Sequence, residues 1–266
     1  MLAHHGESAK VLAGGQSLVP VLNSRLGRYE QIIDLNRIAE LSYIRADGDC
    51  LHLGSMTRQR AIEASPLVAQ YAPLLSEVTK HVGHLPIRTR GTIGGSIAHA
   101  DPAAEDPAAM LALEAEFELL SAQGRRTVKA TDFFEGPLQT ALSSQELLVD
   151  IRIPRCPAET TFAFEEFSRR PGDFAIVGIA ALLIWDADRI ADARLAVCGL
   201  SRGAIRLEAG ERELKNERPM GPLIAEAAHA AAMSIEPQSD LHASADYRRH
   251  LVEALTTVAL ERATSR

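Results

Sequence analysis

Two glycine-rich stretches, Ala13-Gly14-Gly15-Gln16-Ser17 and Thr92-Ile93-Gly94-Gly95-Ser96, decide the fold of this chain. Each lies beside an apolar segment, so each is expected to form a tight turn next to a buried element. Glycine adopts left-handed backbone angles easily and lets another group approach without a Cβ in the way. Two such turns in one chain predict a backbone cradle for a phosphate-bearing cofactor. A plain strand-to-helix turn without a ligand explains each one equally well.

The first stretch joins a predicted strand to a predicted helix. Residues 10–13 are expected to form a short buried strand, and Ser17 is placed to cap a helix over residues 18–26 with its Leu and Val side chains on one face. The start of a helix carries partial positive charge, which suits a pyrophosphate. The spacing matches neither the Rossmann nor the P-loop glycine motif, so those two kinds of site are disfavoured.

The second stretch is followed by further polar groups. The hydroxyls of Thr92 and Ser96 suit phosphate or ribityl oxygens, and the Asp101 carboxylate suits sugar hydroxyls, which are donors. A helix cap before Pro102 explains Asp101 equally well. By the same reasoning, Asp106 is expected to cap a helix over residues 107–113.

The remaining periodicity predicts an α+β protein. Hairpins are expected around Asp47-Gly48 and Gln123-Gly124, and a strand over residues 147–153 ends at Pro154. Further strands are expected over residues 31–35, 162–169, 174–185 and 193–199, and helices over residues 57–64, 66–82, 208–216, 223–234 and 245–262. In the last helix, Arg248 is expected to face water.

Composition excludes several classes of protein. The chain has 28 Lys and Arg against 35 Asp and Glu, a net charge of −7, and no basic run of the kind that binds nucleic acid or membrane surfaces. No apolar stretch is long enough for a transmembrane helix, and the first residues lack a signal-peptide pattern. A cytoplasmic protein without a transmembrane segment is therefore expected.

The titratable residues indicate no catalytic machinery. Cys50, Cys156 and Cys198 are far apart, so neither a disulfide framework nor an iron–sulfur cluster is expected in this chain. His81-Val82-Gly83-His84 is interpreted as a loop or helix end rather than a metal site, and Glu165-Glu166 as a solvated face. With no catalytic residue and no metal ligand predicted, the chemistry is expected to belong to a bound cofactor.

In this order, the two stretches resemble the flavin motifs of the FAD-binding medium subunit of molybdenum hydroxylases, of the carbon monoxide dehydrogenase type. The resemblance continues through Asp173-Phe174-Ala175 and Tyr247-Arg248-Arg249 and spans essentially the whole chain. It implies a two-subdomain FAD-binding fold of the vanillyl-alcohol-oxidase (PCMH) type over residues 1–157, divided at about residue 56. A C-terminal α+β domain is implied over residues 158–266.

The resemblance also implies a site for FAD, held without a covalent bond. Ala13, Gly14, Gly15, Gln16 and Ser17 would hold the pyrophosphate through their backbone. Thr92, Ile93, Gly94, Gly95 and Ser96 would form the opposite wall. Asp101 would bind the ribityl or ribose side, and Leu148 and Glu166 would lie near the isoalloxazine.

The implied function is electron transfer within a complex, a dimer of heterotrimers. A large molybdopterin subunit would oxidise the substrate, and a small subunit would pass electrons through 2Fe-2S clusters to this FAD. An acceptor such as a quinone or NAD would then take them. Two alternatives remain: a flavin-free structural subunit of the same complex, and an FAD/NADPH reductase related to the cell-wall precursor reductase. The intact pair of glycine stretches argues against the first, and no proton-donor pattern supports the second.

The start of the chain departs from the family pattern. Family members usually have a strand and a helix before the first motif. Here residues 2–5 are expected to be the end of that helix, with Gly6 as its C-cap. So short a segment is not expected to form a stable helix. A late-assigned start or a truncation would explain this, and it would expose a flank of the first sheet and weaken FAD retention.

Overall fold

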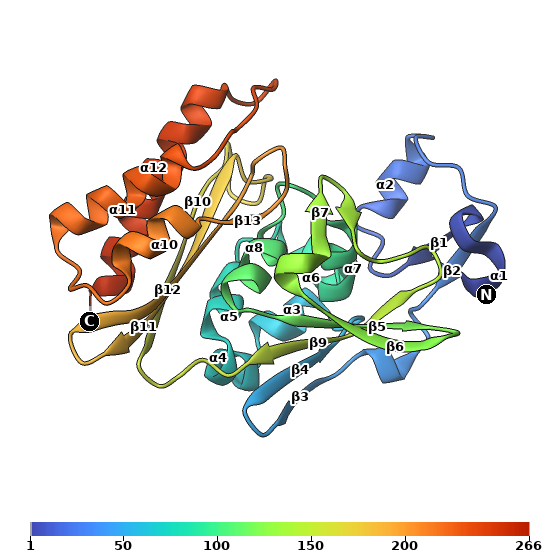
Figure 1. Ribbon diagram of the computed structural model, residues 1–266. Coiled ribbons are helices and arrows are strands. Elements are labelled where there is room, and N and C mark those ends of the chain that lie inside the picture. Colours follow the sequence, from blue (N-terminus) through green and yellow to red (C-terminus); the bar gives the residue numbers. More distant parts are fainter. Residues whose placement is uncertain (1, 266) are drawn as a thin grey trace.

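The first glycine stretch lies in a small parallel unit at one end of the molecule, as a computed structural model describing residues 2–265 shows (Figure 1). Strand β1 (Ala9–Leu12) pairs in parallel with β2 (Gln31–Asp34), and α2 (Leu18–Asn23) lies between them in sequence. Ser17 directly precedes α2, but its side chain makes no capping hydrogen bond, contrary to expectation.

A short helical segment precedes β1. Residues 2–5, expected to be the end of a helix, form one helical turn, α1 (Leu2–His5), followed by the 3-10 turn η1 (Gly6–Ser8). Ser8 Oγ donates to the His5 carbonyl oxygen at 2.9 Å, which satisfies one of the helix-end acceptors. Gly6, with φ +49°, ends α1 as predicted.

The middle of the molecule is built on a five-stranded antiparallel sheet. Both predicted hairpins are confirmed, with left-handed Gly48 and Gly124 at their turns. In spatial order the strands are β3 (Ile44–Asp47), β4 (Cys50–Gly54), β9 (Leu147–Pro154), β5 (Glu116–Ser121) and β6 (Gly124–Lys129).

Helices cover this sheet and form the main core with it. The single helix expected over residues 66–82 is two helices, because Pro73 lacks the N–H that a continuous helix needs and begins a new one. The packed helices are α3 (Gln59–Glu63), α4 (Pro66–Tyr71), α5 (Pro73–Thr79) and α8 (Glu105–Ala112).

The second glycine stretch is part of a helix rather than a turn. Gly94 and Gly95 lie in the first turn of α7 (Ile93–His99), and Thr92 caps that helix by accepting a hydrogen bond from Gly95 N at 3.1 Å. The expected cap at Asp106 is wrong, because α8 already begins at Glu105 and Asp106 is buried inside it. Asp101 caps no helix either, since its Oδ1 accepts from Ala103 N in a local turn.

Short elements connect these larger ones. They include η2 (Ala39–Leu41), α6 (Leu85–Arg90), α9 (Ala130–Phe133), and a two-stranded sheet of β7 (Phe134–Gly136) and β8 (Gln139–Thr140). Helix α6 directly precedes the second glycine stretch and was not predicted. Its first turn contains a proline, which favours helix initiation.

The C-terminal part is a second antiparallel sheet with helices on both faces. Its strands are β10 (Thr160–Phe167), β11 (Val177–Asp186), β12 (Arg189–Cys198) and β13 (Ile205–Arg206). Alternating β11 residues face either the main core or a separate core with the C-terminal helices. These helices are α10 (Glu208–Leu214), α11 (Gly221–Met233) and α12 (Ala245–Thr264). Helices α5 and α8 contact the sheet from the main-core side.

The expectation that Arg248 faces water is wrong. Its side chain is buried in α12, where it donates to the carbonyl oxygens of Ile176 and Gly199 at 2.6 and 2.5 Å. It also pairs with Asp240 Oδ2 at 2.6 Å. Loop carbonyls beside the sheet need donors, and the long guanidinium supplies them.

The overall class is α+β, as predicted. Among residues 2–265, we find no helix with the length and apolar character needed to cross a bilayer.

Candidate functional site

The structure brings the two glycine stretches into contact. A Cβ added to Gly14 would overlap the Arg90 carbonyl oxygen and lie 2.8 Å from Gly91 Cα, immediately before the second stretch. A Cβ added to Gly95 would lie 3.4 Å from the Ala13 side chain. The predicted juxtaposition of the two stretches is therefore present.

Protein backbone, rather than open space for a ligand, explains the glycines at two of these positions. Gly14 packs on the end of α6, and Gly94 packs on the backbone of Ser55, where an added Cβ would lie 2.7 Å from the Ser55 Cα. Alanine at either position would force two segments apart. Gly15 is required for a different reason, because its φ of +74° is left-handed.

The two stretches differ in what their amides do. Among residues 2–265, no acceptor receives a hydrogen bond from the backbone N–H groups of residues 14–17. In the second stretch, by contrast, the amides of residues 93–96 all have acceptors. The amides of Ile93, Gly94, Gly95 and Ser96 donate to Thr57 O, Ser55 O, Thr92 Oγ1 and Thr92 O. The first stretch can therefore bind an anion through its backbone N–H groups. The second stretch packs against the first and holds it in place.

A polar network from distant residues holds the first stretch in place. Asn36 Nδ2 donates to the Ala13 carbonyl oxygen at 3.0 Å, and Arg58 Nη2 donates to Asn36 Oδ1 at 2.7 Å. Arg58 Nη1 also donates to the Arg90 carbonyl oxygen. Asp34 accepts from Asn36, and these hydrogen bonds hold the pKa of its carboxyl below the ordinary value. No local pattern in the sequence indicates this network, because Ala13, Asn36 and Arg58 are more than 20 residues apart.

Asp101 lies just beyond α7 with part of its carboxylate available. Ala100, at φ +50°, turns the chain out of the helix. One Asp101 oxygen accepts from Ala103 N at 2.9 Å, and the other lies 3.9 Å from His99 Nε2. The side chain is 29% exposed, so it can accept further hydrogen bonds. Burial lowers the pKa of His99.

Leu148 is more deeply buried than expected for a residue in direct contact with a ligand. Its side chain is 2% exposed and belongs to the main core. Its neighbours Leu147 and Val149 pack instead with Val11 and Ala13, behind the first glycine stretch. A role for Leu148 beside the isoalloxazine stays a prediction.

The expectation of a solvated face at Glu165-Glu166 is wrong for the second residue. Glu165 forms an ion pair with Arg262, while Glu166, alternating along β10, faces Glu105 of α8. Burial raises the pKa of Glu166 to about 7, although hydrogen bonds with Ser168 and Glu105 oppose the shift. Burial, reinforced by the Glu166 charge, raises the pKa of Glu105 well above its ordinary value. The two carboxyls therefore retain a proton near neutral pH.

Helix α8 connects this acidic pair to the glycine stretches. Gln59 Nε2 donates to Asp106 Oδ2 at 2.7 Å, next to Glu105 in sequence. The backbone of Gln59 donates to the Gly91 carbonyl oxygen at 3.0 Å. Burial raises the pKa of Asp106. Glu105 and Asp106 thus belong to the same packed unit as the first stretch.

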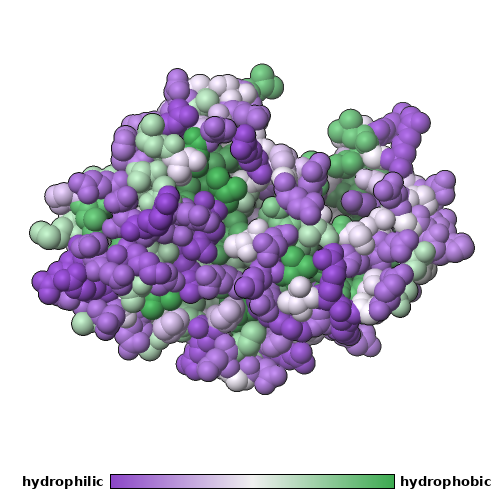
Figure 2. Space-filling view, viewed as in Figure 1, coloured by the Kyte–Doolittle hydropathy of each residue, from purple (hydrophilic) through white to green (hydrophobic). Residues whose placement is uncertain are grey.

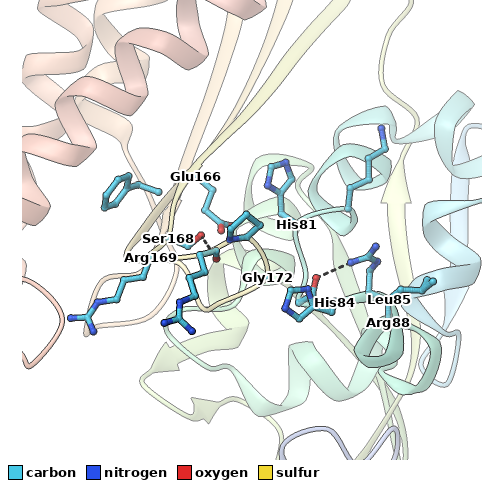
Figure 3. Close-up of a pocket in the computed structure, with 13 residues that line it drawn as sticks. His81, His84, Leu85, Arg88, Glu166, Ser168, Arg169 and Gly172 are labelled. Carbon is cyan, nitrogen blue, oxygen red and sulfur yellow. Dashed lines mark hydrogen bonds between the residues drawn. The ribbon is translucent and has the colours of Figure 1, made fainter.

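A pocket of about 510 Å³ opens beside Glu166 (Figure 3). One wall comes from the segment between α5 and α6, with His81 and His84, and the other from the β10–β11 loop. Gly172, at φ +85°, lets this loop approach the His84 ring, where a Cβ would overlap the imidazole.

Arg88 holds the first wall of this pocket. It donates to the carbonyl oxygens of Val82 and Gly83 at 3.0 and 2.8 Å and pairs with Glu63 at 3.0 Å. His81 packs against the Phe164 ring with the centroids 4.9 Å apart. Within the described residues, no three His, Cys, Asp or Glu side chains are grouped to hold a metal ion.

Two family models match the chain. Residues 1–156 match the FAD binding domain in molybdopterin dehydrogenase, and residues 162–263 match the CO dehydrogenase flavoprotein C-terminal domain.

Characterised relatives align over nearly their whole length. Caffeine dehydrogenase subunit beta of Pseudomonas sp. (strain CBB1) is 41% identical, covering 100% of this chain and 90% of the relative. The 6-hydroxypseudooxynicotine dehydrogenase complex subunit alpha of Paenarthrobacter nicotinovorans is 38% identical, with the same coverage of each. The carbon monoxide dehydrogenase from Hydrogenophaga pseudoflava that lacks the Mo-pyranopterin moiety superposes with a TM-score of 0.96 at 38% identity. That superposition covers 98% of this chain and 91% of that one.

Proposed function

The chain belongs to the family of FAD-binding medium subunits of molybdenum hydroxylases, an oxidoreductase family, and from this premise we propose that it transfers electrons within such a complex. Electrons would come from 2Fe-2S clusters on a small subunit, supplied by a large molybdopterin subunit, and leave to an external acceptor. The complex would be a dimer of heterotrimers. The observation that carries the proposal is the row of unpaired amides at residues 14–17, supported by the second glycine stretch.

The first stretch fits the pyrophosphate of FAD. The unpaired N–H groups of Gly14, Gly15, Gln16 and Ser17 can donate to phosphate oxygens without breaking any internal hydrogen bond. The Asn36–Arg58 network fixes the Ala13 carbonyl, which orients the following amides. Thr92 to Ser96 would form the opposite wall by packing and through the Ser96 hydroxyl, because the amides of residues 93–96 are already used.

Figure 2 shows a hollow between α2 and the C-terminal helices, above α6 and α7 in the view of Figure 1. We place the ribityl side at the available Asp101 oxygen and the isoalloxazine near Glu166. Bound there without a covalent bond, FAD would accept electrons singly from a cluster and release them to the acceptor.

Replacing Gly14 tests the proposed FAD site. Gly14→Ala should lower the FAD content of the purified protein at least about ten-fold, because the new Cβ separates the stretch from α6 and misplaces the amides. FAD is measured by acid release and chromatography, and folding by circular dichroism. Gly221→Ala is the matched control, since nothing lies within 4 Å of its added Cβ.

Two results would contradict the proposal. Wild-type protein purified with its partner subunits and lacking flavin absorbance would exclude electron transfer through FAD. Full FAD occupancy in folded Gly14→Ala would remove the first stretch from the site.

A further inference from the structure

The pocket beside Glu166 has a positive rim in a protein of negative net charge. Arg169 and Arg170 are exposed on the β10–β11 loop and line the pocket, whereas the whole chain carries −7. Neither guanidinium has a carboxylate partner among residues 2–265. Arg169 donates only to the Leu241 carbonyl oxygen at 3.4 Å.

The other cations of the pocket are already neutralised. Arg88 pairs with Glu63, and Lys80 pairs with Glu77 at 2.7 Å. Glu166 is the one carboxylate among the lining residues, and it shares its surroundings with Glu105 rather than pairing with either loop arginine. The two loop arginines therefore supply the free charge at the opening.

The pocket is close to the proposed FAD site. Helix α6 joins the two, because Leu85 at its start lines the pocket and Arg90 at its end contacts Gly14. A six-residue helix spans only about 9 Å. A flavin with its phosphates on the first stretch can therefore present its other end at Glu166, inside the pocket.

We propose that this pocket is the port where a small, multiply charged anionic electron acceptor approaches the flavin, guided by Arg169 and Arg170. This proposal rests on the proposed function. It restricts the electron acceptor of the flavin to anions, such as a dinucleotide with its pyrophosphate, in preference to a neutral quinone. Unpaired arginines at the mouth of a pocket raise the local concentration of anions and bind phosphate groups well.

The test uses flavin reoxidation, which needs no knowledge of the substrate of the complex. The FAD-containing protein is reduced with dithionite in the absence of oxygen and mixed rapidly with ferricyanide or with 1,4-benzoquinone. Each fully reduced flavin gives one electron to each of two ferricyanide ions and releases two protons to water. Benzoquinone takes both electrons and both protons and becomes the hydroquinone.

The double variant Arg169→Gln/Arg170→Gln should slow reoxidation by ferricyanide about 5- to 10-fold at low salt. Reoxidation by benzoquinone should change less than about two-fold, because a neutral molecule is not steered by charge. The difference should shrink as salt rises. At constant ionic strength, inorganic pyrophosphate should slow the ferricyanide reaction of the wild type and not that of the double variant. Arg218→Gln removes one positive charge from an exposed arginine outside the pocket and should leave both rates unchanged.

Equal rates for the wild type and the double variant with ferricyanide, or an equal loss with both acceptors, would overturn the proposal while leaving FAD binding intact. Absence of flavin from the wild type would instead overturn the proposed function. The FAD content measured for every variant separates these two outcomes.

Discussion

At the scale of single residues, neighbouring side chains in one strand have opposite surroundings. Glu165 and Glu166 are adjacent in β10, yet Glu165 pairs with Arg262 and Glu166 faces a second carboxyl, Glu105. One Glu166 oxygen has no hydrogen-bond partner among the described residues. Such a buried acidic pair costs stability when it ionises, and one member, Glu166, lines the pocket proposed for the acceptor.

We predict that Glu166→Gln changes how stability depends on pH. The pKa of Glu166 is raised from its ordinary value of 4.5 to about 7, so the folded state holds more protons than the unfolded state between these values. Stability should therefore fall as pH rises from about 4.5 to 7. The variant should lose part of this slope and be more stable than the wild type above pH 7. After allowance for partial solvent exposure, we expect a gain of about 1–2 kcal/mol.

Urea unfolding between pH 5 and 8 measures this effect. Glu165→Gln is the matched control, and it should keep the wild-type slope because Glu165 does not face Glu105. Identical slopes for Glu166→Gln and the wild type would show that Glu166 ionises freely in the folded protein.

At the scale of elements, the second glycine stretch shows how a local pattern can be misread. Two adjacent glycines indicate a turn by propensity. Here they lie in the first turn of α7, where Thr92 caps the helix and the Ser55 backbone lies against Gly94. The close packing of two segments selects glycine at this position, and that packing outweighs its low helix propensity.

Removal of the Thr92 cap should destabilise helix α7, which begins with the second glycine stretch. Thr92→Val keeps the shape of the side chain but leaves Gly95 N without its acceptor, and we expect a loss of about 1–2 kcal/mol. Thr92→Ser keeps the hydroxyl and should lose clearly less. Chemical denaturation measures both, and equal losses for the two variants would mean that packing, rather than the cap, accounts for the effect.

At the scale of the whole molecule, buried polar contacts join parts that are distant in sequence. Arg248 of α12 ties the β11 and β12 ends of the C-terminal sheet to the Asp240 loop. On the other side of the same sheet, the Gly199 amide donates to the Pro102 carbonyl oxygen at 2.7 Å, close to Asp101. The C-terminal sheet is thereby linked to the segment that follows the second glycine stretch.

Arg248→Met should therefore be strongly destabilising. It leaves the carbonyls of Ile176 and Gly199 without this donor, and we expect a loss of about 3 kcal/mol. Arg249→Met, at the adjacent position, breaks only an exposed ion pair with Asp246 and should change stability by less than about 0.5 kcal/mol. Thermal unfolding compares them, and similar melting temperatures would show that the Arg248 contacts contribute little.

The sequence by itself determined the elements whose signals are local. The hairpins at Gly48 and Gly124, the long strands β10 to β12 and the three C-terminal helices follow from periodicity and turn residues that act over a few positions. The resemblance to a flavin-binding family was also readable from two short motifs. Family membership is confirmed by the matching models.

Only the tertiary structure decided which groups meet. The contact of Gly14 with Arg90, the Asn36–Arg58 network and the Glu105–Glu166 pair each join residues from different elements. The split at Pro73 and the helical position of Gly94 also depended on packing. Backbone periodicity carries information over one or two turns, whereas these contacts arise when loops close and segments pack together. The two glycine stretches were therefore visible in the sequence. The fact that one supplies free amides and the other supports it became visible only in the fold.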